Sequence, residues 1–343
     1  MIRYRKNTSL LPYNTFGVNA KASHLFFIAS PEELPELLDF PCFRQKTADV
    51  SDILVLGQGS NILFTNDFKG VIVKSEIGGI KVTYEDESSV VIDVGSGVVW
   101  NDLVDFAVSR DWWGIENLSL IPGTVGAAPV QNIGAYGAEA ADVIIRVNAF
   151  HPGKGEWMVL ENRECGFGYR DSIFKKELKN KVVITSVVFR FSKRARPLLD
   201  YSGIREELER QHISDPSAME ISEAVASVRR SKLPDPAVLG NAGSFFKNPL
   251  ISEVQYRELC VKYPQIRAHR QDDQYKIPAA WLIEQAGWKG FREGSTGCYE
   301  KQPLILVNYG GATGKQILAF SEKIQESVFS LFGIALEREV NVF

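Results

Sequence analysis

The hydrophobic pattern of this chain changes near residue 200. Before that point, short apolar runs are separated by glycine turns, which is typical of strands. The runs cover residues 53–57, 70–75, 79–85, 89–97 and 181–192. Beyond residue 203, apolar residues recur three and four positions apart, which predicts helices. These segments are 217–231, 251–262, 277–286 and 313–332. A strand-rich half followed by a helix-rich half predicts an α+β protein with at least two domains.

The ends of some elements can also be predicted. One helix is expected before residue 200, with Asn101 as its N-cap and Gly114 as its stop signal. The longest helical pattern, 313–332, has Thr313 to cap its start and Gly333 to end it. The chain then closes with a predicted strand, residues 335–343.

Length and charge limit the class of protein and its partners. A chain of 343 residues exceeds what one core usually supports, so we expect two or three domains. The 39 Lys and Arg residues nearly balance 42 Asp and Glu residues, which gives no general attraction for nucleic acid or anionic lipid. Apolar runs shorter than the roughly 18 residues of a membrane helix, and a start without a secretory pattern, indicate a cytoplasmic protein without a membrane partner.

The cysteines and histidines do not form a recognisable metal or disulfide pattern. The four cysteines lie far apart in the sequence, and none belongs to a C-x-x-C pair. We therefore expect reduced thiols, as in most cytoplasmic proteins. The four histidines have no metal-ligand spacing, so we predict no metal site and find a Ser-His-Asp hydrolase poorly supported.

A first glycine motif follows an apolar strand in 53-ILVLGQGSNILF-64. Its two glycines allow a sharp turn whose amides can approach a pyrophosphate. A dinucleotide-binding Rossmann motif would need a third glycine and a helix, but 62-ILF-64 continues as strand-like sequence. We reject the Rossmann interpretation; taken alone, the motif fits a plain strand–turn–strand about as well as a phosphate loop.

A second glycine-rich stretch, 115-IENLSLIPGTVGAAPVQNIGAYG-137, carries almost no charge after Glu116. Such a segment cannot be solvated like an ordinary surface loop, but it can lie close against a large flat ligand. A tight structural crossing within a sheet is the alternative, and small residues would suit it too. Two such stretches in the strand-rich half favour a nucleotide-type cofactor.

Six motifs in a fixed order carry a family resemblance. They are NTFG (14–17), GQGSN (57–61), IPGTVGAAPVQNIGAYG (121–137), GYRDSIF (168–174), KLPDP (232–236) and GNAGSFFKNP (240–249). With these motifs the chain resembles the UDP-N-acetylenolpyruvoylglucosamine reductases, flavoenzymes of peptidoglycan precursor synthesis. The resemblance extends from Asn14 to Glu339.

The resemblance implies a fold and a division into domains. The fold would be α+β, with an FAD-binding domain of the vanillyl-alcohol-oxidase/PCMH type, built of two subdomains, and a C-terminal α+β substrate-binding domain. We place the FAD-binding subdomains at residues 1–75 and 76–215 and the substrate-binding domain at 216–334. The terminal strand 335–343 would join the first subdomain. We expect a cytoplasmic bacterial enzyme that is a monomer.

The resemblance also implies the reaction. NADPH would reduce non-covalently bound FAD, which would then reduce UDP-N-acetylglucosamine enolpyruvate to UDP-N-acetylmuramate. This step serves cell-wall biogenesis and thereby cell shape and division. The reaction saturates an enol-ether double bond conjugated to a carboxylate. The flavin carries the hydride, so the protein must orient the substrate, stabilise the enediolate charge and deliver a proton.

Binding residues follow from the same resemblance. The residues expected to bind FAD are Gly57, Gln58, Gly59, Ser60, Asn61, Pro122, Gly123, Thr124, Gly126, Ala127, Ile133, Gly134, Ala135, Tyr136 and Arg229. Those expected to bind substrate or the nicotinamide cofactor are Tyr169, Tyr201, Lys232, Lys247, Asn248 and Gln302. Within 198-LLDYSGI-204, which is similar to a loop of the longer family subtype, Tyr201 would close over the diphosphate. As lone residues, most of the second set would be ordinary surface groups.

Two matched side chains suit the chemistry of charge and proton. Arg170 presents a planar fork of donors that fits a carboxylate or enediolate; the alternative is a structural ion pair with Asp171. Ser244 matches the family's proton donor, and Gly243 before it would allow a tight turn that presents the hydroxyl. A hydrogen-bonded turn serine is the alternative there.

Glu339 is the third residue matched to the family's catalytic set. Strand alternation places Glu337, Glu339 and Asn341 on one face, and spacing alone cannot choose between the two glutamates. The resemblance selects Glu339, which we hypothesise to be protonated or hydrogen-bonded when it acts. Some relatives carry arginine where this chain has Asn341, so we assign no cofactor-phosphate contact to that position.

Two other classes of protein remain open at this point. The first is a flavin oxidase of the same superfamily, many of which attach FAD through histidine or cysteine. Neither residue occurs in 57–61 or 121–137, which counts against covalent attachment there. The second is a non-catalytic nucleotide-binding protein, which need not retain Arg170, Ser244 and Glu339 together.

Overall fold

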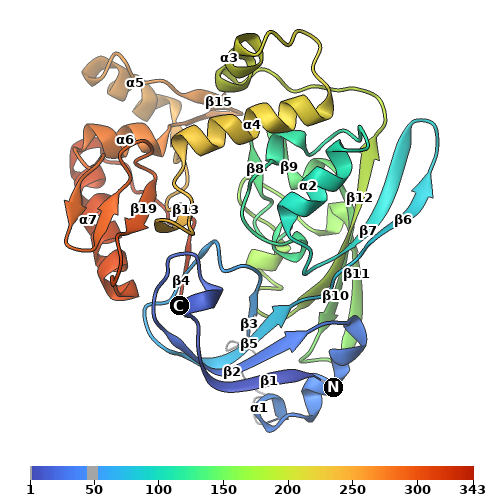
Figure 1. The fold of residues 1–343 in the computed structure, drawn as a ribbon. Coiled ribbons are helices and arrows are strands. Elements are labelled where there is room, and N and C mark those ends of the chain that lie inside the picture. Colours follow the sequence, from blue (N-terminus) through green and yellow to red (C-terminus); the bar gives the residue numbers. More distant parts are fainter. Residues whose placement is uncertain (1, 45–52) are drawn as a thin grey trace. The chain divides into compact units, whose positions relative to one another are not determined.

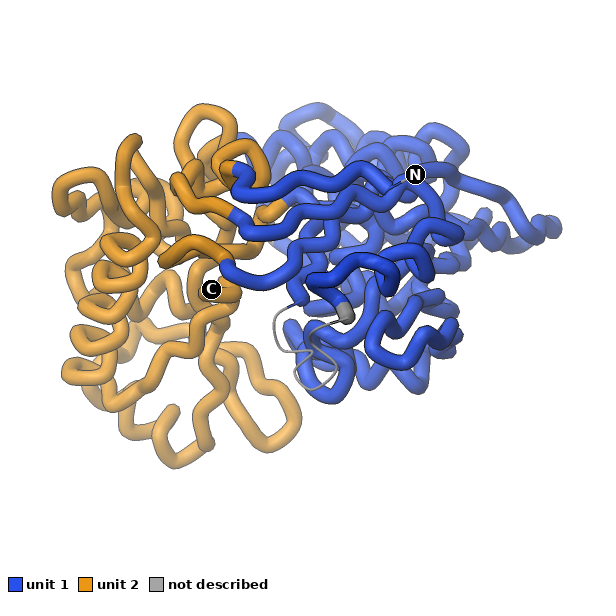
Figure 2. The backbone as a smooth tube through the Cα atoms, turned by 90° about the horizontal axis from the view of Figure 1, so that it is seen from below, with its two compact units in different colours: residues 1–8, 22–58, 69–231 blue, residues 9–21, 59–68, 232–343 orange. Residues whose placement is uncertain are grey.

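The computed structural model of the protein describes residues 2–44 and 53–343 (Figure 1). The chain divides into two compact units, which Figure 2 distinguishes. Unit 1 comprises residues 1–8, 22–58 and 69–231, and unit 2 comprises residues 9–21, 59–68 and 232–343. The chain therefore passes more than once from one unit to the other. The three-domain division at 1–75, 76–215 and 216–334 stays a prediction.

Unit 1 contains two main sheets. The smaller has the strand order β1 (Arg3–Ser9), β2 (Lys21–Ile28), β5 (Phe68–Ser75) and β3 (Ile53–Leu56). The larger has the order β11 (Glu156–Glu161), β10 (Ile144–His151), β12 (Val183–Ser192), β7 (Ser89–Gly95) and β6 (Ile80–Glu85), and all its neighbours are antiparallel. A two-stranded ribbon pairs β8 (Gly134–Ala135) with β9 (Ala138–Glu139).

The helices of unit 1 are α1 (Pro41–Arg44), α2 (Trp100–Val108), α3 (Ser202–Arg210) and α4 (Ala218–Lys232). Of these, α2, α3 and α4 build the larger of its cores on one face of the five-stranded sheet. Apolar side chains of α2, α3 and α4 join those of β7, β10 and β12 in one buried cluster. For example, the ring of Trp100 meets that of Phe189 edge-on, with centroids 6.1 Å apart. The other face contributes Phe150 and Val183 to a second core with the smaller sheet.

Unit 2 is built around its own core. Its first sheet has the order β13 (Gly240–Ser244), β19 (Ile305–Asn308), β18 (Thr296–Cys298) and β17 (Arg292–Glu293). Its second has the order β14 (Leu250–Ser252), β16 (Gln274–Lys276) and β15 (His269–Gln271), and β20 (Asn341–Val342) pairs in parallel with β4 (Ile62–Leu63). The helices are α5 (Glu253–Lys262), α6 (Ala279–Gln285) and α7 (Gly314–Phe332).

Most predicted elements are present, but three details were wrong. Helix α2 ends at Val108 with Ser109 as its C-cap, so Gly114 is not its stop signal. Helix α7 begins after the N-cap Thr313, whose hydroxyl accepts from Gln316 N–H, and ends at Gly333 with φ +65°, as predicted. The N-cap of α2, however, is Val99, because the Asn101 side chain instead accepts from Leu120 N–H at 2.8 Å. The predicted strand 335–343 is reduced to β20, apart from a single bridge at Arg338.

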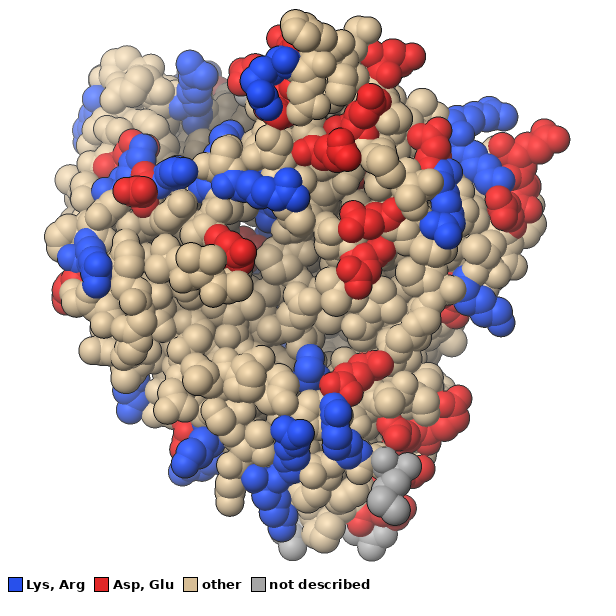
Figure 3. Space-filling model, viewed as in Figure 1, with Lys and Arg blue, Asp and Glu red and all other residues tan. Residues whose placement is uncertain are grey.

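The surface charges on one face and the four cysteines can be compared with what the sequence predicts. Lysine and arginine side chains are interspersed with aspartate and glutamate over the face in Figure 3, as the nearly balanced charge predicts. The four cysteines, all in the described part of the chain, form no disulfide. Burial raises the pKa of both Cys165 and Cys298 to about 12, which suits packing rather than reactivity. Among the helices of residues 2–44 and 53–343, none has the length and apolar character needed to cross a membrane.

Candidate active site

In unit 1, the first two residues of the GQGSN motif lie against the second glycine-rich segment. A Cβ at Gly57 would lie 2.8 Å from Thr124 Oγ1, and Gly123 N–H donates to Gln58 Oε1 at 2.9 Å. Lys74 Nζ donates to the Gly57 carbonyl at 2.9 Å, and burial lowers the pKa of this lysine. The backbone of the two loops is therefore fixed at close range, with side chains too small to cover it.

The middle of the second segment is a short 3-10 turn, Val125–Ala127, seated on the end of β7. Gly126 N–H donates to Ser96 O and Val125 N–H to Val98 O, both at 2.9 Å. A Cβ at Gly126 would lie 2.5 Å from the Ser96 Cβ. Glycine is required here for close approach and not for an unusual backbone angle.

The last part of this segment meets a buried arginine. Tyr136 has a left-handed backbone (φ +50°), and its hydroxyl is hydrogen-bonded to Arg229 of α4. Burial raises the pKa of Tyr136. The Nε of Arg229 is buried without a hydrogen-bond partner in the described part of the chain. A buried guanidinium group with an unused donor, next to a glycine-rich loop, fits the pyrophosphate of a dinucleotide.

The loop that carries Tyr201 is linked to the glycine-rich segment 115–137 by hydrogen bonds. The amide Nδ2 of Asn117 donates to both Tyr136 O (2.8 Å) and Leu198 O (2.9 Å). The Tyr201 ring, half exposed at the start of α3, stands edge-on to the Tyr136 ring with centroids 5.8 Å apart. A movement of the Tyr201 loop would therefore disturb contacts of the glycine-rich segment.

Arg170 occupies a strained position in a tight turn. Gly168 and Asp171 exchange two main-chain hydrogen bonds, of 3.0 and 3.2 Å, across Tyr169 and Arg170. Arg170 has φ +54° while Tyr169 does not have a positive φ, which is the pattern of a type II turn. Glycine or asparagine usually fills that position, and arginine there costs about 1–2 kcal/mol.

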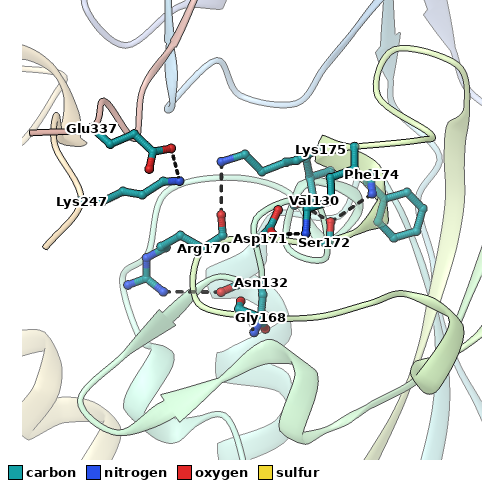
Figure 4. A network of polar contacts seen from close by, with 11 residues as sticks. Val130, Asn132, Gly168, Arg170, Asp171, Ser172, Phe174, Lys175, Lys247 and Glu337 are labelled. Carbon is teal, nitrogen blue, oxygen red and sulfur yellow. Dashed lines mark hydrogen bonds and ion pairs between the residues drawn. The ribbon is translucent and has the colours of Figure 1, made fainter. Parts of the chain in front are cut away.

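The side chain of Arg170 points to the glycine-rich segment. Its guanidinium donates to Gly134 O at 2.5 Å and to Asn132 O at 3.4 Å (Figure 4), and it lies 5.3 Å from the Tyr169 ring centroid. Asp171 forms its ion pair with Lys176 at 2.5 Å. The structure thus gives Asp171, which the structural alternative paired with Arg170, an ion pair with Lys176.

In unit 2, main-chain pairing joins Glu339 to the residue that follows Ser244. Glu339 N–H donates to Phe245 O at 2.8 Å, and Phe246 forms an antiparallel bridge with Arg338. The half-buried Glu339 is therefore the main-chain neighbour of Phe245, and Ser244, the exposed last residue of β13, directly precedes Phe245. Gly243 has φ +69° within β13, where the β13–β19 register shifts, so a strand irregularity precedes the serine instead of the expected tight turn.

The rest of the GQGSN motif belongs to unit 2 and reaches the same terminal segment. A Cβ at Gly59 would lie 2.1 Å from Tyr13 O, and Thr15 N–H donates to Gly59 O at 3.2 Å. Asn61 Nδ2 donates to Glu339 O at 3.3 Å, and Asn341 N–H donates to Asn61 O at 3.1 Å. Asn61 and Glu339 are thus neighbours in unit 2, whereas Arg170 belongs to unit 1.

The remaining candidate ligands for substrate have local partners or stand in solvent. The Lys247 ammonium pairs with Glu337, which distinguishes that glutamate from Glu339 (Figure 4). Asn248 Oδ1 accepts from Ala279 N–H at 2.9 Å, at the start of α6. Gln302 Oε1 accepts from Leu304 N–H at 3.5 Å, and Lys232 is exposed at the end of α4. Their binding roles stay predictions.

Several residues of these loops were not singled out from the sequence. Asn117 and Lys74 fix main-chain carbonyl groups of the glycine-rich loops, and Asn132 Nδ2 fixes the Gly168 carbonyl of the turn that carries Arg170. Their signal is a polar side chain within an apolar segment or strand, which must find a partner when it is buried. That signal does not say which carbonyl it will reach.

Comparisons with known proteins cover nearly the whole chain. Residues 23–161 match the family model described as FAD binding domain, and residues 235–343 match UDP-N-acetylenolpyruvoylglucosamine reductase, C-terminal domain. The UDP-N-acetylenolpyruvoylglucosamine reductase of Chromobacterium violaceum is 44% identical over 340 residues, 98% of either chain. That of Bacteroides fragilis is 46% identical over 334 residues, 97% of this chain and 98% of the other.

A solved structure is similar over its full length. The crystal structure of UDP-N-acetylenolpyruvylglucosamine reductase from Thermus caldophilus superposes with a TM-score of 0.66 at 26% identity. The superposition covers 100% of this chain and 99% of that one. The overall fold of this chain is therefore that of a solved structure.

Proposed function

The chain belongs to the UDP-N-acetylenolpyruvoylglucosamine reductase family, and from that premise we propose how its residues perform the reaction. The enzyme uses NADPH and FAD to reduce UDP-N-acetylglucosamine enolpyruvate to UDP-N-acetylmuramate, a step of peptidoglycan precursor synthesis. We further propose that it acts in the cytoplasm as a monomer. The single observation that carries the mechanism is the main-chain pairing of Phe245 with Glu339, which supports a joint role for Ser244 and Glu339.

The loops of unit 1 fit FAD. Gly57, Gln58 and the segment 121–137 present closely spaced backbone with small side chains, and Arg229 offers an unused buried donor for phosphate oxygens. We propose Gly59, Ser60 and Asn61 as further ligands of FAD. When bound, the flavin supplies the hydride that adds to the terminal carbon of the enolpyruvyl group.

The protein's own contribution is to charge and proton transfer. As the double bond is saturated, negative charge moves onto the substrate carboxylate. The Arg170 guanidinium, held by two carbonyl groups, stabilises that charge with oriented N–H donors. The Ser244 hydroxyl donates its proton to the enediolate carbon, and Glu339, protonated or hydrogen-bonded, stabilises the enediolate together with Arg170.

The Ser244→Ala variant tests this assignment. Under anaerobic conditions, NADPH should still bleach the flavin absorbance at close to the wild-type rate. Recovery of the absorbance on adding the enolpyruvyl substrate should slow by roughly 10²–10⁴-fold, the usual contribution of a positioned acid. Ser252→Ala is the matched control, because Ser252 caps α5 in the same unit and should affect only stability.

Two outcomes would count against the proposal in different ways. If both steps slow equally in Ser244→Ala, Ser244 has a structural role. If the wild-type protein carries no FAD, or if its reduced flavin is not reoxidised by the substrate, the proposed activity itself fails. Sedimentation equilibrium would test the monomer.

A further inference from the structure

Two loops of unit 1, the glycine-rich segment and the 168–171 turn, are hydrogen-bonded to each other through Asn132 and Arg170 (Figure 4). We call these mutual hydrogen bonds the clasp. Asn132 Nδ2, in the glycine-rich segment, donates to Gly168 O at 3.2 Å, at the start of the 168–171 turn. In the opposite direction, the Arg170 guanidinium donates to the carbonyl oxygens of Asn132 and Gly134. Each loop therefore holds the other through one side chain.

The amide of Asn132 is fixed by two further hydrogen bonds. Its Oδ1 accepts from Ala141 N–H at 2.9 Å, and its Nδ2 also donates to Glu139 Oε2 at 2.6 Å. Both hydrogens of Nδ2 are thus used, one of them toward a carboxylate, which makes the stronger kind of bond. With only 1% of Asn132 exposed, the amide cannot rotate without losing buried hydrogen bonds.

The backbone on both sides of the clasp is in an unfavourable conformation. Asn132 has φ +45° and Arg170 has φ +54°, in the left-handed region that most residues avoid. Such conformations persist only where surrounding contacts determine them, and they concentrate at functional sites. Gly134 provides the space, because a Cβ there would lie 2.9 Å from Arg170 Nη1.

We propose that Asn132 is a positioning residue that sets the direction of the Arg170 guanidinium. The inference rests on the proposed role of Arg170 in stabilising the enediolate. Stabilisation of that kind requires donors that are already oriented where charge develops, and a displacement of about 1 Å can cost roughly 100-fold in rate. Asn132 fixes both the turn that carries Arg170 and one of the carbonyl groups that the guanidinium contacts.

Two variants remove the clasp in different ways. Asn132→Gly keeps the left-handed backbone and deletes the amide, while Asn132→Asp keeps the acceptor for Ala141 N–H and loses both donors. Both should carry FAD and be reduced by NADPH within about twofold of the wild-type rate. Reoxidation by the enolpyruvyl substrate should slow about 10–100-fold in both.

Asn162→Ala is the matched control. The Asn162 amide donates to Ala141 O (2.9 Å) and Ile144 O (2.8 Å), so its loss also removes two side-chain bonds to the main chain of unit 1. Both steps should stay within about twofold of the wild-type rates. Equal slowing of both steps in the Asn132 variants would identify a merely structural role and overturn the proposal.

A double-mutant cycle distinguishes positioning from an independent effect. Arg170→Gln alone should slow reoxidation by about 10²–10³-fold, as for the loss of an oriented donor. Adding Asn132→Gly should then slow it by less than about threefold more, because there is no guanidinium left to position. Slowing factors that multiply would refute the proposal. So would a wild-type reoxidation rate in Arg170→Gln, whereas failure of the wild-type protein to be reoxidised would refute the proposed function instead.

Hydrogen exchange gives a test that does not depend on turnover. In flavin-free protein, the amides of Gly168 and Asp171 are protected by their mutual bonds across the turn. Asn132→Gly should raise their exchange rates by about tenfold or more, while Asn162→Ala should not. Wild-type exchange rates in Asn132→Gly would show that the clasp does not hold the turn. If the glycine variant does not fold, Asn132→Asp is measured in its place.

Discussion

Gly126→Ala adds one methyl group where the glycine-rich segment rests on β7. The added Cβ would lie 2.5 Å from the Ser96 Cβ and 3.1 Å from the Ser96 carbonyl oxygen. Ordinary contact begins near 3.4 Å, so the turn must move by about 0.9 Å or displace a buried serine. Ser96 has little freedom to move, since only 1% of it is exposed and its hydroxyl is hydrogen-bonded to that of Ser75 at 2.6 Å.

The expected cost is that of overpacking a well-filled site, about 1–3 kcal/mol. For domains of about 150–250 residues this lowers Tm by roughly 2–4 °C for each kcal/mol. The displaced turn also carries Thr124 and Ala127, which the proposal assigns to FAD. We therefore expect the Kd for FAD to rise more than about tenfold, equivalent to about 1.4 kcal/mol.

Gly78→Ala is the control, because no heavy atom of the described residues lies within 4 Å of the position its Cβ would take. The chemical change is the same and neither glycine is left-handed. Calorimetry and fluorescence titration of flavin-free protein with FAD would measure both quantities. If Gly126→Ala matches the control in Tm and in the Kd for FAD, the close-approach argument is wrong.

Two further predictions concern charge and substrate binding. Glu116 is 2% exposed, and burial raises its pKa. Above pH 4.5 the folded state therefore binds more protons than the unfolded state, so the free energy of unfolding falls as pH rises through the folded pKa. Glu116→Gln should retain the acceptor for Gly114 N–H and lack this fall, so urea midpoints from pH 4 to 8 should show its advantage growing with pH. If the Tyr201 hydroxyl contacts the diphosphate, Tyr201→Phe should raise the KM for the UDP-sugar. Tyr201→Ala should raise the KM further, because it also removes the ring contact with Tyr136. Equal KM values in wild type and Tyr201→Phe would exclude the hydroxyl contact.

Regular elements and the family were predictable from local signals. Thr313 and Gly333 mark α7 because capping chemistry is contained in a few adjacent residues. Six ordered motifs identified the family and the fold class, which the full-length relatives and the two family models confirm. These signals need no knowledge of which distant segments meet.

Where contacts between distant segments determine the local structure, the sequence was less informative. Alternation in 335–343 predicted one strand, but the main chain of 337–339 pairs with 245–247, whereas that of 341–343 pairs with β4 and its neighbours. Asn101 looked like a cap because its amide can bond nearby main chain, yet it reaches Leu120 instead. Side-chain bonds to distant main chain depend on tertiary placement, and Asn132 was overlooked for the same reason.

The conformation of Arg170 was likewise not predictable, and it allows a direct test of stored strain. Replacement by alanine or by glycine removes the guanidinium equally, so activity should be lost equally. Alanine at φ +54° retains the unfavourable backbone, whereas glycine adopts it readily. The free energy of unfolding of Arg170→Gly should therefore exceed that of Arg170→Ala by about 1 kcal/mol, measured by urea denaturation. At most positions the order is the opposite, and the glycine variant is the less stable protein. An Arg170→Ala variant as stable as Arg170→Gly would mean that the turn relaxes without its arginine, so that the side chain imposes the strain.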